Sequence, residues 1–270
     1  MGQECDIPVS ELGKNSIQKV VYEQPMIIIP IPSPMCNEKW TYGSNGNDWE
    51  CKCKEGTNQS PINLPPKHEA ITIKQNALFE FKTVTRDEET GSLEMVLEDF
   101  KLTIHGRFGK LVNWDLVTYE AKKVEFHSKG EHTISNEKYD LEAQIYYDSI
   151  SAGNIQKKAV VSVLFKGKPG AMNYFFDKTI NILDLPDRGE TKRQLNKSIN
   201  LESLFRQDES DSYTPFSYYK YEGSVTSPPC EEETTWYVAH PVIDLSTTVI
   251  EYFRDIFKYT PVILYLFMLN

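Results

Sequence analysis

Residues 124–133 read Val-Glu-Phe-His-Ser-Lys-Gly-Glu-His-Thr, and residues 139–147 read Tyr-Asp-Leu-Glu-Ala-Gln-Ile-Tyr-Tyr. Each stretch contains a run of the kind that forms a β-strand. Because residues i and i+2 of a strand project from the same face, Glu125 and His127 point together. In the second stretch, the side chains that share a face are Glu142, Gln144 and Tyr146. The two stretches therefore predict two strands, each with one polar face.

Alternating or apolar runs bounded by turn residues predict the strands of the domain. The strands expected from these runs are Leu102–Ile104, Lys122–His127, Ala143–Tyr147 and Ala159–Phe165. Near the end of the chain, Val249, Phe253 and Ile256 repeat at helical spacing, which predicts an amphipathic helix. Thr248 and Glu251 are spaced as a capping box for its first turn.

The composition is that of an ordinary soluble globular chain, with 40% hydrophobic and 25% charged residues among 270. This length suffices for one large β-rich domain with tails. The net charge of −10 and the lack of a basic cluster argue against nucleic acid as a partner. No apolar stretch reaches the roughly 20 residues of a membrane-spanning helix. The first residues lack the features of a secretory signal.

The sequence divides into three parts. Residues 1–37 form a proline-rich arm, residues 38–258 form the domain body, and residues 259–270 form an apolar tail. The prolines of residues 25–35 favour an extended arm, while the isoleucines between them are too apolar for a freely solvated segment. The tail predicts either an edge strand of the same sheet or a buried contact on a partner.

Two further motifs are Gln59-Ser-Pro-Ile-Asn63 and Gly223-Ser-Val-Thr-Ser-Pro-Pro-Cys230. Together with the two strands they make the chain resemble the α-class carbonic anhydrases. The resemblance implies a mostly β, β-rich α+β fold with a large, twisted, mainly antiparallel sheet and short peripheral helices. That family holds one zinc ion with three histidines on two neighbouring strands, and the matching positions here are Glu125, His127 and Gln144.

These three positions do not suit a catalytic zinc. The family needs neutral imidazoles, because the metal must stay acidic enough to give hydroxide at neutral pH. Glu125 would add negative charge, and the amide oxygen of Gln144 is a poor zinc ligand. We expect His127 to be a hydrogen-bonded residue in a polar cavity, the other interpretation being a weak adventitious metal site. No cofactor is therefore expected, and the alternative is a zinc carbonate dehydratase with an unusual Glu-His-Gln site.

The pocket implied by the resemblance is also altered. Tyr146 stands two positions after the third ligand position, where its ring would fill the space for carbon dioxide. Phe100 aligns with the proton-shuttle histidine of the family and cannot carry a proton, although His105 lies nearby in the sequence. The remaining expected pocket residues are Val160, Val225 and Trp236.

Other residues of the family's site persist. Glu131 and His132 match a pair after the first two ligands, Glu142 matches a carboxylate near the third, and Thr226 matches the threonine that orients the zinc-bound hydroxide through the Glu131 position. A buried Glu–His–Thr network can also persist because it satisfies the polar groups of a core. With two ligands replaced, we favour this structural interpretation and expect no catalytic residue.

The resemblance implies one disulfide. Members of the family often join a cysteine six residues before Gln-Ser-Pro to the cysteine that ends Pro-Pro-Cys, which here are Cys53 and Cys230. Such a bond needs an oxidising compartment, either secretory or extracellular, or an organelle lumen or intermembrane space.

Two sequence motifs are formal acceptors of N-linked glycans, Asn58-Gln-Ser60 and Asn196-Lys-Ser198. We discount the first, because Pro61 follows it and it lies in a core motif.

The resulting prediction is a catalytically inactive carbonic-anhydrase-like protein, similar to the acatalytic members of the family. We expect it to act as a structural or binding subunit that contacts other proteins through residues 25–35, residues 261–269 or both. A membrane-associated partner is an alternative, and so is a pocket that binds a small anion.

Overall fold

The computed structural model describes residues 49–50, 52–71, 77–86, 93–98, 101–150, 157–207 and 216–258. The predicted arm, the predicted tail and Phe100 lie outside the described residues. The elements in chain order are α1 (Lys52–Glu55), β1 (Asn63–Leu64), β2 (Leu78–Phe81), β3 (Leu93–Glu98), β4 (Lys101–His105), β5 (Gly109–Val112), β6 (Thr118–His127), β7 (Thr133–Ile134), β8 (Glu137–Lys138), β9 (Leu141–Ser149), β10 (Lys158–Lys168), the π-helix η2 (Phe175–Thr179), β11 (Lys192–Leu195), the 3₁₀-helix η3 (Leu201–Phe205), β12 (Ser217–Gly223), β13 (Thr234–His240), β14 (Ile243–Ser246) and α2 (Thr247–Lys258).

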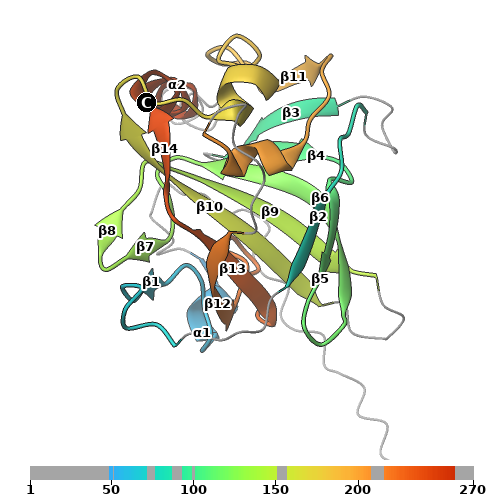
Figure 1. Ribbon diagram of the computed structural model, residues 1–270, viewed down its shortest axis with the longest axis vertical. Helices are drawn as coiled ribbons and strands as arrows, with labels where there is room; N and C mark the ends of the chain where they lie inside the picture. The colour runs from blue at the N-terminus through green and yellow to red at the C-terminus, as the bar shows by residue number, and fades with distance from the viewer. Residues whose placement is uncertain are drawn as a thin grey trace, which may run out of the picture. The chain divides into compact units, whose positions relative to one another are not determined.

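A large twisted sheet of 11 strands dominates the domain (Figure 1). Its main path runs β11-β3-β4-β6-β9-β10-β13-β12, with β14 beside β10, and with β5 joining β2 to β6. Most pairs are antiparallel, while β10 runs parallel to both β13 and β14. The predicted fold class, a mainly antiparallel sheet with short peripheral helices, is confirmed.

The four predicted strands are also confirmed. They lie within β4, β6, β9 and β10, four consecutive strands of the sheet. Each real strand extends beyond its predicted range by one to several residues, because backbone pairing continues past the apolar run that marks a strand in the sequence. The polar faces of β6 and β9 are therefore neighbours.

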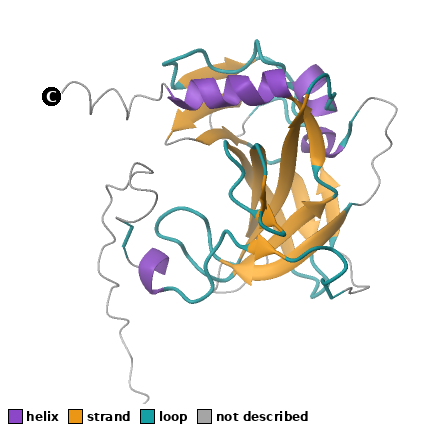
Figure 2. Cartoon of the chain, turned by 90° about the vertical axis from the view of Figure 1, so that its left-hand side faces the viewer, coloured by secondary structure: helices purple, strands orange, loops and turns teal. Residues whose placement is uncertain are grey.

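One face of these central strands carries the main hydrophobic core. On β6, β9 and β10, the buried side chains that form it include Val124, Phe126, Ala143, Ile145, Val161 and Val163. The helix α2 packs over this core, next to the sheet in Figure 2. Its residues Val249, Phe253 and Ile256 are all buried, which confirms the predicted amphipathic helix. The ring of Phe253 lies 5.8 Å from the ring of Phe126.

The predicted capping box of this helix is wrong. The helix begins at Thr247, so Thr248 lies inside its first turn. The side-chain oxygen of Ser246 instead accepts a hydrogen bond from the Thr248 backbone N–H at 3.3 Å. Ser246 is the last residue of β14. Because the strand runs directly into the helix, its last residue provides the cap.

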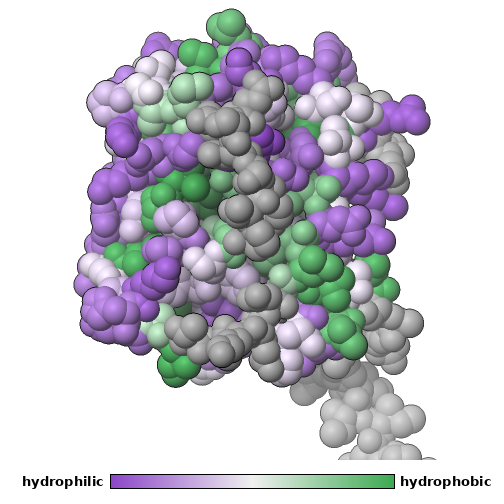
Figure 3. Space-filling model, in the orientation of Figure 1, coloured by the Kyte–Doolittle hydropathy of each residue, from purple (hydrophilic) through white to green (hydrophobic). Residues whose placement is uncertain are grey.

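Exposed hydrophobic side chains gather at one end of the sheet. We define the hairpin-tip patch as Leu78, Trp114, Leu116 and Ile150. The β2–β5 register sets Leu78 opposite Val112, just before the β5–β6 turn, and the Ile150 backbone N–H bonds to Thr118 just after that turn. In the view of Figure 3, green surface appears at the lower right, where Figure 1 shows β2 and β5.

In the part of the chain that the structure describes, no helix has the length and apolar character needed to cross a membrane.

Candidate functional site

The candidate site occupies the polar face of β6 and β9. The register of these strands sets Glu125 opposite Gln144, and His127 opposite Glu142. All four side chains are buried. The positions that match the zinc ligands of the family therefore lie on adjacent strands, as the resemblance implies.

Glu125 is held by two lysine side chains. One of its oxygens accepts hydrogen bonds from Nζ of Lys101 at 2.9 Å and Nζ of Lys123 at 2.7 Å. Burial alone would raise the pKa of Glu125, but His127 and the two lysines outweigh it and hold that pKa well below its usual value. The carboxylate is therefore ionised and already neutralised by protein cations.

His127 lies between two carboxylates. Its Nε2 atom is 3.4 Å from an oxygen of Glu125, and its Nδ1 atom is 3.5 Å from an oxygen of Glu131. Burial alone would lower the pKa of His127, but the charges of Glu131 and Glu125 outweigh this effect and raise it. The neutral form that binds metals is thus disfavoured.

Gln144 uses both ends of its amide within the protein. Its nitrogen donates to Glu131 at 2.7 Å and to Glu142 at 3.1 Å. Its oxygen accepts a hydrogen bond from the Tyr146 hydroxyl at 2.7 Å. The carboxylate of Glu131 therefore joins His127 to Gln144, two of the three matching positions.

Glu142 is the most heavily bonded carboxylate of the site. One oxygen accepts from the backbone N–H groups of Glu131 at 2.8 Å and His132 at 2.9 Å. The other accepts from Nδ1 of His132 at 2.7 Å and from the Ser162 hydroxyl at 2.8 Å. Burial raises its pKa, yet the charge and hydrogen bonds of His132 dominate and lower it to about 2. Since Glu142 is ionised, the Nδ1 atom of His132 is the donor.

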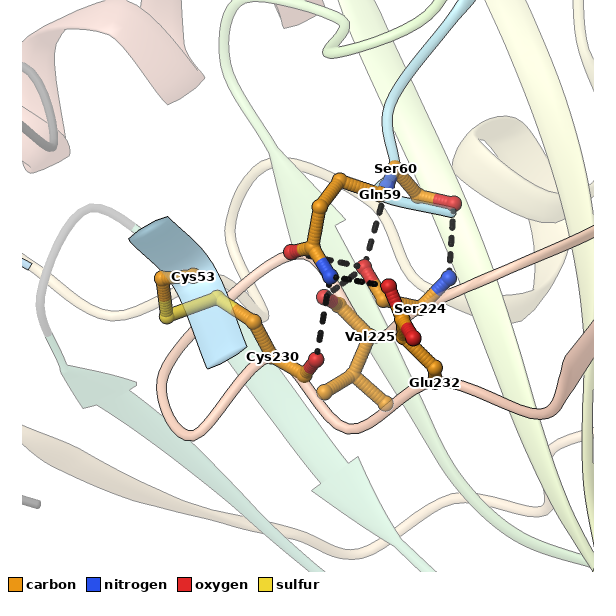
Figure 4. Close-up of a disulfide and its surroundings, with 7 residues drawn as sticks. All are labelled: Cys53, Gln59, Ser60, Ser224, Val225, Cys230 and Glu232. Carbon is orange, nitrogen blue, oxygen red and sulfur yellow. Dashed lines mark hydrogen bonds between the residues drawn. A yellow bond between two sulfur atoms is a disulfide. The ribbon is translucent and has the colours of Figure 1, made fainter. Parts of the chain in front are cut away.

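The other ring nitrogen of His132 connects the site to the Gln-Ser-Pro and Gly-Ser-Val-Thr segments. Its Nε2 atom lies 2.6 Å from the oxygen of Tyr221, whose hydroxyl donates to Ser60 at 2.9 Å. The Ser60 and Ser224 side chains each accept a bond from the other's backbone N–H, at 2.9 and 3.1 Å (Figure 4). These hydrogen bonds connect the Gln-Ser-Pro segment to the Gly-Ser-Val-Thr segment, and connect both segments through His132 to Glu142.

The same two segments are joined covalently. Cys53 and Cys230 form a disulfide, with Cα atoms 4.9 Å apart and 177 positions apart in the sequence (Figure 4). The predicted disulfide is therefore present. Beside it, the Gln59 amide donates to Glu232 at 3.0 Å.

The register also aligns most of the predicted pocket residues. Val160 lies opposite Tyr146 on one side and Trp236 on the other. These three belong to one small hydrophobic cluster on the polar face of the sheet, and Nζ of Lys123 sits 4.5 Å from the centre of the Tyr146 ring. Val225 is half-buried and is not among the members of that cluster. Phe100 lies outside the described residues.

Thr226 has different surroundings from those that the resemblance implies. It is buried, but among the described residues its hydroxyl has no hydrogen-bond partner. Glu131, the carboxylate expected to orient it, is bonded to Gln144 instead. The Thr226–Glu131 link is thus replaced by one between Glu131 and Gln144.

A family model for the eukaryotic-type carbonic anhydrases matches residues 38–262. The chain belongs to this family.

Individual relatives agree with that assignment. The chain is 31% identical over 214 residues to dioscorin dioA3 of Dioscorea japonica, covering 79% of this chain and 71% of that protein. It is 28% identical over 225 residues to alpha carbonic anhydrase 3 of Arabidopsis thaliana, covering 80% and 71%. A solved dioscorin complexed with ascorbate aligns with a TM-score of 0.60 at 25% identity, covering 76% and 78% of the two chains. The α-carbonic anhydrase of Thermovibrio ammonificans with sulfanilamide, at 24% identity, shows the same fold, with a TM-score of 0.65 and coverage of 82% and 92%.

Against this family, the donor set of the site does not fit a catalytic zinc. A carbonic anhydrase presents three neutral imidazoles, whereas this chain presents a lysine-paired carboxylate, a histidine between two carboxylates and an amide whose oxygen is occupied. Among the residues described by the structure, no three His, Cys, Asp or Glu side chains are arranged to hold a metal ion.

Sequence reasoning missed the residues that complete the network. Lys101 and Lys123 neutralise Glu125, while Ser162 and Tyr221 bond to Glu142 and His132. The i, i+2 spacing of Lys123 and Glu125 was an available signal. The other contacts depend on which strands are neighbours and in which register, which the sequence does not specify.

Proposed function

We propose that this carbonic-anhydrase-like domain does not hydrate carbon dioxide and that it serves as a structural or binding subunit of a larger assembly. The observation that carries the loss of catalysis is the closed hydrogen-bond network of Gln144. Its amide nitrogen donates to Glu131 and Glu142 and its oxygen accepts from Tyr146, so a metal ion would have to compete with these hydrogen bonds.

The second candidate function is a zinc carbonate dehydratase with a Glu-His-Gln site. It would require His127 to give up its proton while it remains between Glu125 and Glu131. It would also require Glu125 to turn away from Lys101 and Lys123, leaving two buried or half-buried ammonium groups near a divalent cation. Both changes oppose metal binding, so we favour the inactive interpretation.

A binding role is supported by the hairpin-tip patch. Leu116 is 81% exposed and adopts a positive φ of 61°, in the left-handed region that favours glycine. An ordinary side chain in this region costs roughly 1–2 kcal/mol. Within the domain, the Leu116 side chain is not buried and its backbone conformation is unfavourable. Contact with another protein would bury this side chain and so account for a leucine at this position. We place residues 25–35 and 261–269 in the same role, as further contacts with protein partners or with a membrane-associated complex.

The disulfide supports a proposal about the compartment. A bond between Cys53 and Cys230 is compatible with an oxidising environment. We therefore propose a secretory, extracellular, lumenal or intermembrane location.

The test of lost catalysis uses the purified native protein. We expect zinc far below one equivalent per chain by mass spectrometry, and carbon dioxide hydration at the uncatalysed rate in stopped flow. Stoichiometric zinc together with sulfonamide-sensitive hydration would overturn the proposal and establish the dehydratase.

The test of the assembly role compares two exposed leucines. Leu116→Asp should shift the native protein from a large complex towards the monomer in size-exclusion chromatography. Leu183→Asp is the matched control, because Leu183 is 83% exposed but is not part of the patch. A native protein that already migrates as a monodisperse monomer would overturn the assembly role.

A further inference from the structure

We infer that Asn196 is an acceptor of an N-linked glycan. The inference concerns a different region from the candidate site and does not depend on the proposed function. It starts from Asn196-Lys-Ser198, one of two acceptor motifs in the chain.

The Asn196 motif lies in an accessible loop. Asn196 and Ser198 are both exposed, and the segment has neither helical nor strand structure. The loop is nevertheless anchored at both ends. Leu195 pairs with Leu93 on β3, and Ile199 exchanges two backbone hydrogen bonds with Val84, at 2.7 and 2.8 Å. The acceptor is thus presented on a short, fixed segment.

The other motif provides a natural contrast. The hydroxyl of Ser60 contacts both Tyr221 and the Ser224 backbone. The backbone N–H of Asn58 donates to Glu232, and Pro61 follows the motif directly. This segment is clamped beside the Cys53–Cys230 disulfide. Of the two motifs, the structure therefore favours Asn196.

The same disulfide supports the chemistry that this modification needs. A bond between cysteines 177 positions apart persists in an oxidising compartment, and the secretory pathway, where N-linked glycans are added, is one such compartment.

The experiment begins with the native protein. Treatment with peptide-N-glycosidase should lower the intact mass by one glycan and convert Asn196 to Asp in the peptide map. The full chain, secreted from eukaryotic cells, should lose this mass shift completely in Asn196→Gln and Ser198→Ala. It should keep the shift in Ser198→Thr, which preserves the motif, and in Asn58→Gln. A native Asn196 peptide without any glycan, or a shift that survives Asn196→Gln, overturns the assignment.

Discussion

The two faces of the central strands are built on opposite principles. On one face, Phe126 of β6 and Ile145 of β9 point into a continuous hydrophobic core under α2. On the other face, one position away along each strand, Glu125 and Gln144 point into a network of ion pairs and hydrogen bonds. An apolar core tolerates many residues of suitable volume, whereas a buried polar group needs a specific partner. The polar face is therefore where each buried group needs a specific partner, as Glu125 has in Lys101 and Lys123.

The largest effect is expected on the apolar face. The ring of Phe126 lies within 6 Å of the rings of Phe175, Phe176 and Phe253, at 5.7, 5.8 and 5.8 Å. Phe126→Ala should lower the free energy of unfolding by about 3–5 kcal/mol, because it leaves a cavity among these rings. Urea denaturation measures this loss. Leu183→Ala, at an exposed position, should change the same quantity by less than about 0.5 kcal/mol. Similar losses from the two variants would contradict the assignment of the core.

The next effect tests the polar face. Glu142 accepts hydrogen bonds on both oxygens, from Nδ1 of His132 on one and from backbone N–H groups on the other. Glu142→Gln places an NH₂ group against donors in either orientation, so it should lower the free energy of unfolding by about 2–4 kcal/mol. Ser162→Ala removes one neutral donor to the same carboxylate and should cost about 1 kcal/mol. An unchanged free energy of unfolding in Glu142→Gln would show that the network does not stabilise the domain.

The lowered pKa of Glu142 also predicts that the free energy of unfolding decreases at acid pH. Its pKa is lowered from 4.5 to about 2, so its contribution is fully present above pH 4.5 and is lost as the pH falls towards 2. The shift corresponds to about 3 kcal/mol. Denaturation midpoints measured across this range should fall more steeply for the wild type than for Glu142→Gln. Parallel curves would contradict the lowered pKa.

The contrast between the faces explains what the sequence could predict. Four central strands, β4, β6, β9 and β10, and the buried face of α2 follow from residue periodicity, which burial imposes directly. The disulfide and the match of Glu125, His127 and Gln144 to ligand positions followed from the family resemblance. The partners of those residues did not follow, because Lys101 reaches Glu125 from β4 and Tyr221 reaches His132 from β12, across pairings that periodicity does not reveal. The helix cap was missed because nothing in the sequence shows that β14 continues into α2.

A smaller effect should come from the bridge between the two strands. Glu131→Gln keeps an acceptor for the Gln144 amide but removes the charge beside His127. It should lower the free energy of unfolding by about 1–2 kcal/mol. It should also lower the pKa of His127, since Glu131 is the strongest of the charges that raise it.

The sign of the pH dependence follows from the raised pKa of His127. Its contribution is present below the ordinary value of 6.5 and is lost as the pH rises through the higher folded value. NMR titration of the His127 ring in the wild type and in Glu131→Gln measures the change. Glu137→Gln is the matched control, because Glu137 pairs with exposed Lys166 and not with a histidine. An unchanged His127 pKa in Glu131→Gln would show that the charge of Glu131 does not stabilise the protonated form of His127.

The smallest effect, on activity, is expected from restoring the family's ligands. Glu125→His with Gln144→His supplies three imidazoles and should improve zinc binding, measured by equilibrium dialysis. Hydration of carbon dioxide should nevertheless stay near the uncatalysed rate. Tyr146 still packs against the cluster of Val160 and Trp236, and we expect its ring to fill the space that carbon dioxide would need. Lys101 and Lys123 also lose the carboxylate that neutralised them, which places two cations near the metal.

A third substitution separates these causes. Adding Tyr146→Val to the double variant opens the pocket, and a rise in hydration in this triple variant alone would identify the tyrosine as the remaining block. Adding Lys101→Met instead should raise zinc affinity without raising turnover, because it removes a charge but leaves the ring in place. Full turnover by the double variant itself would contradict the role assigned to Tyr146. It would mean that the polar face had lost only its ligands and had kept the shape of an active site.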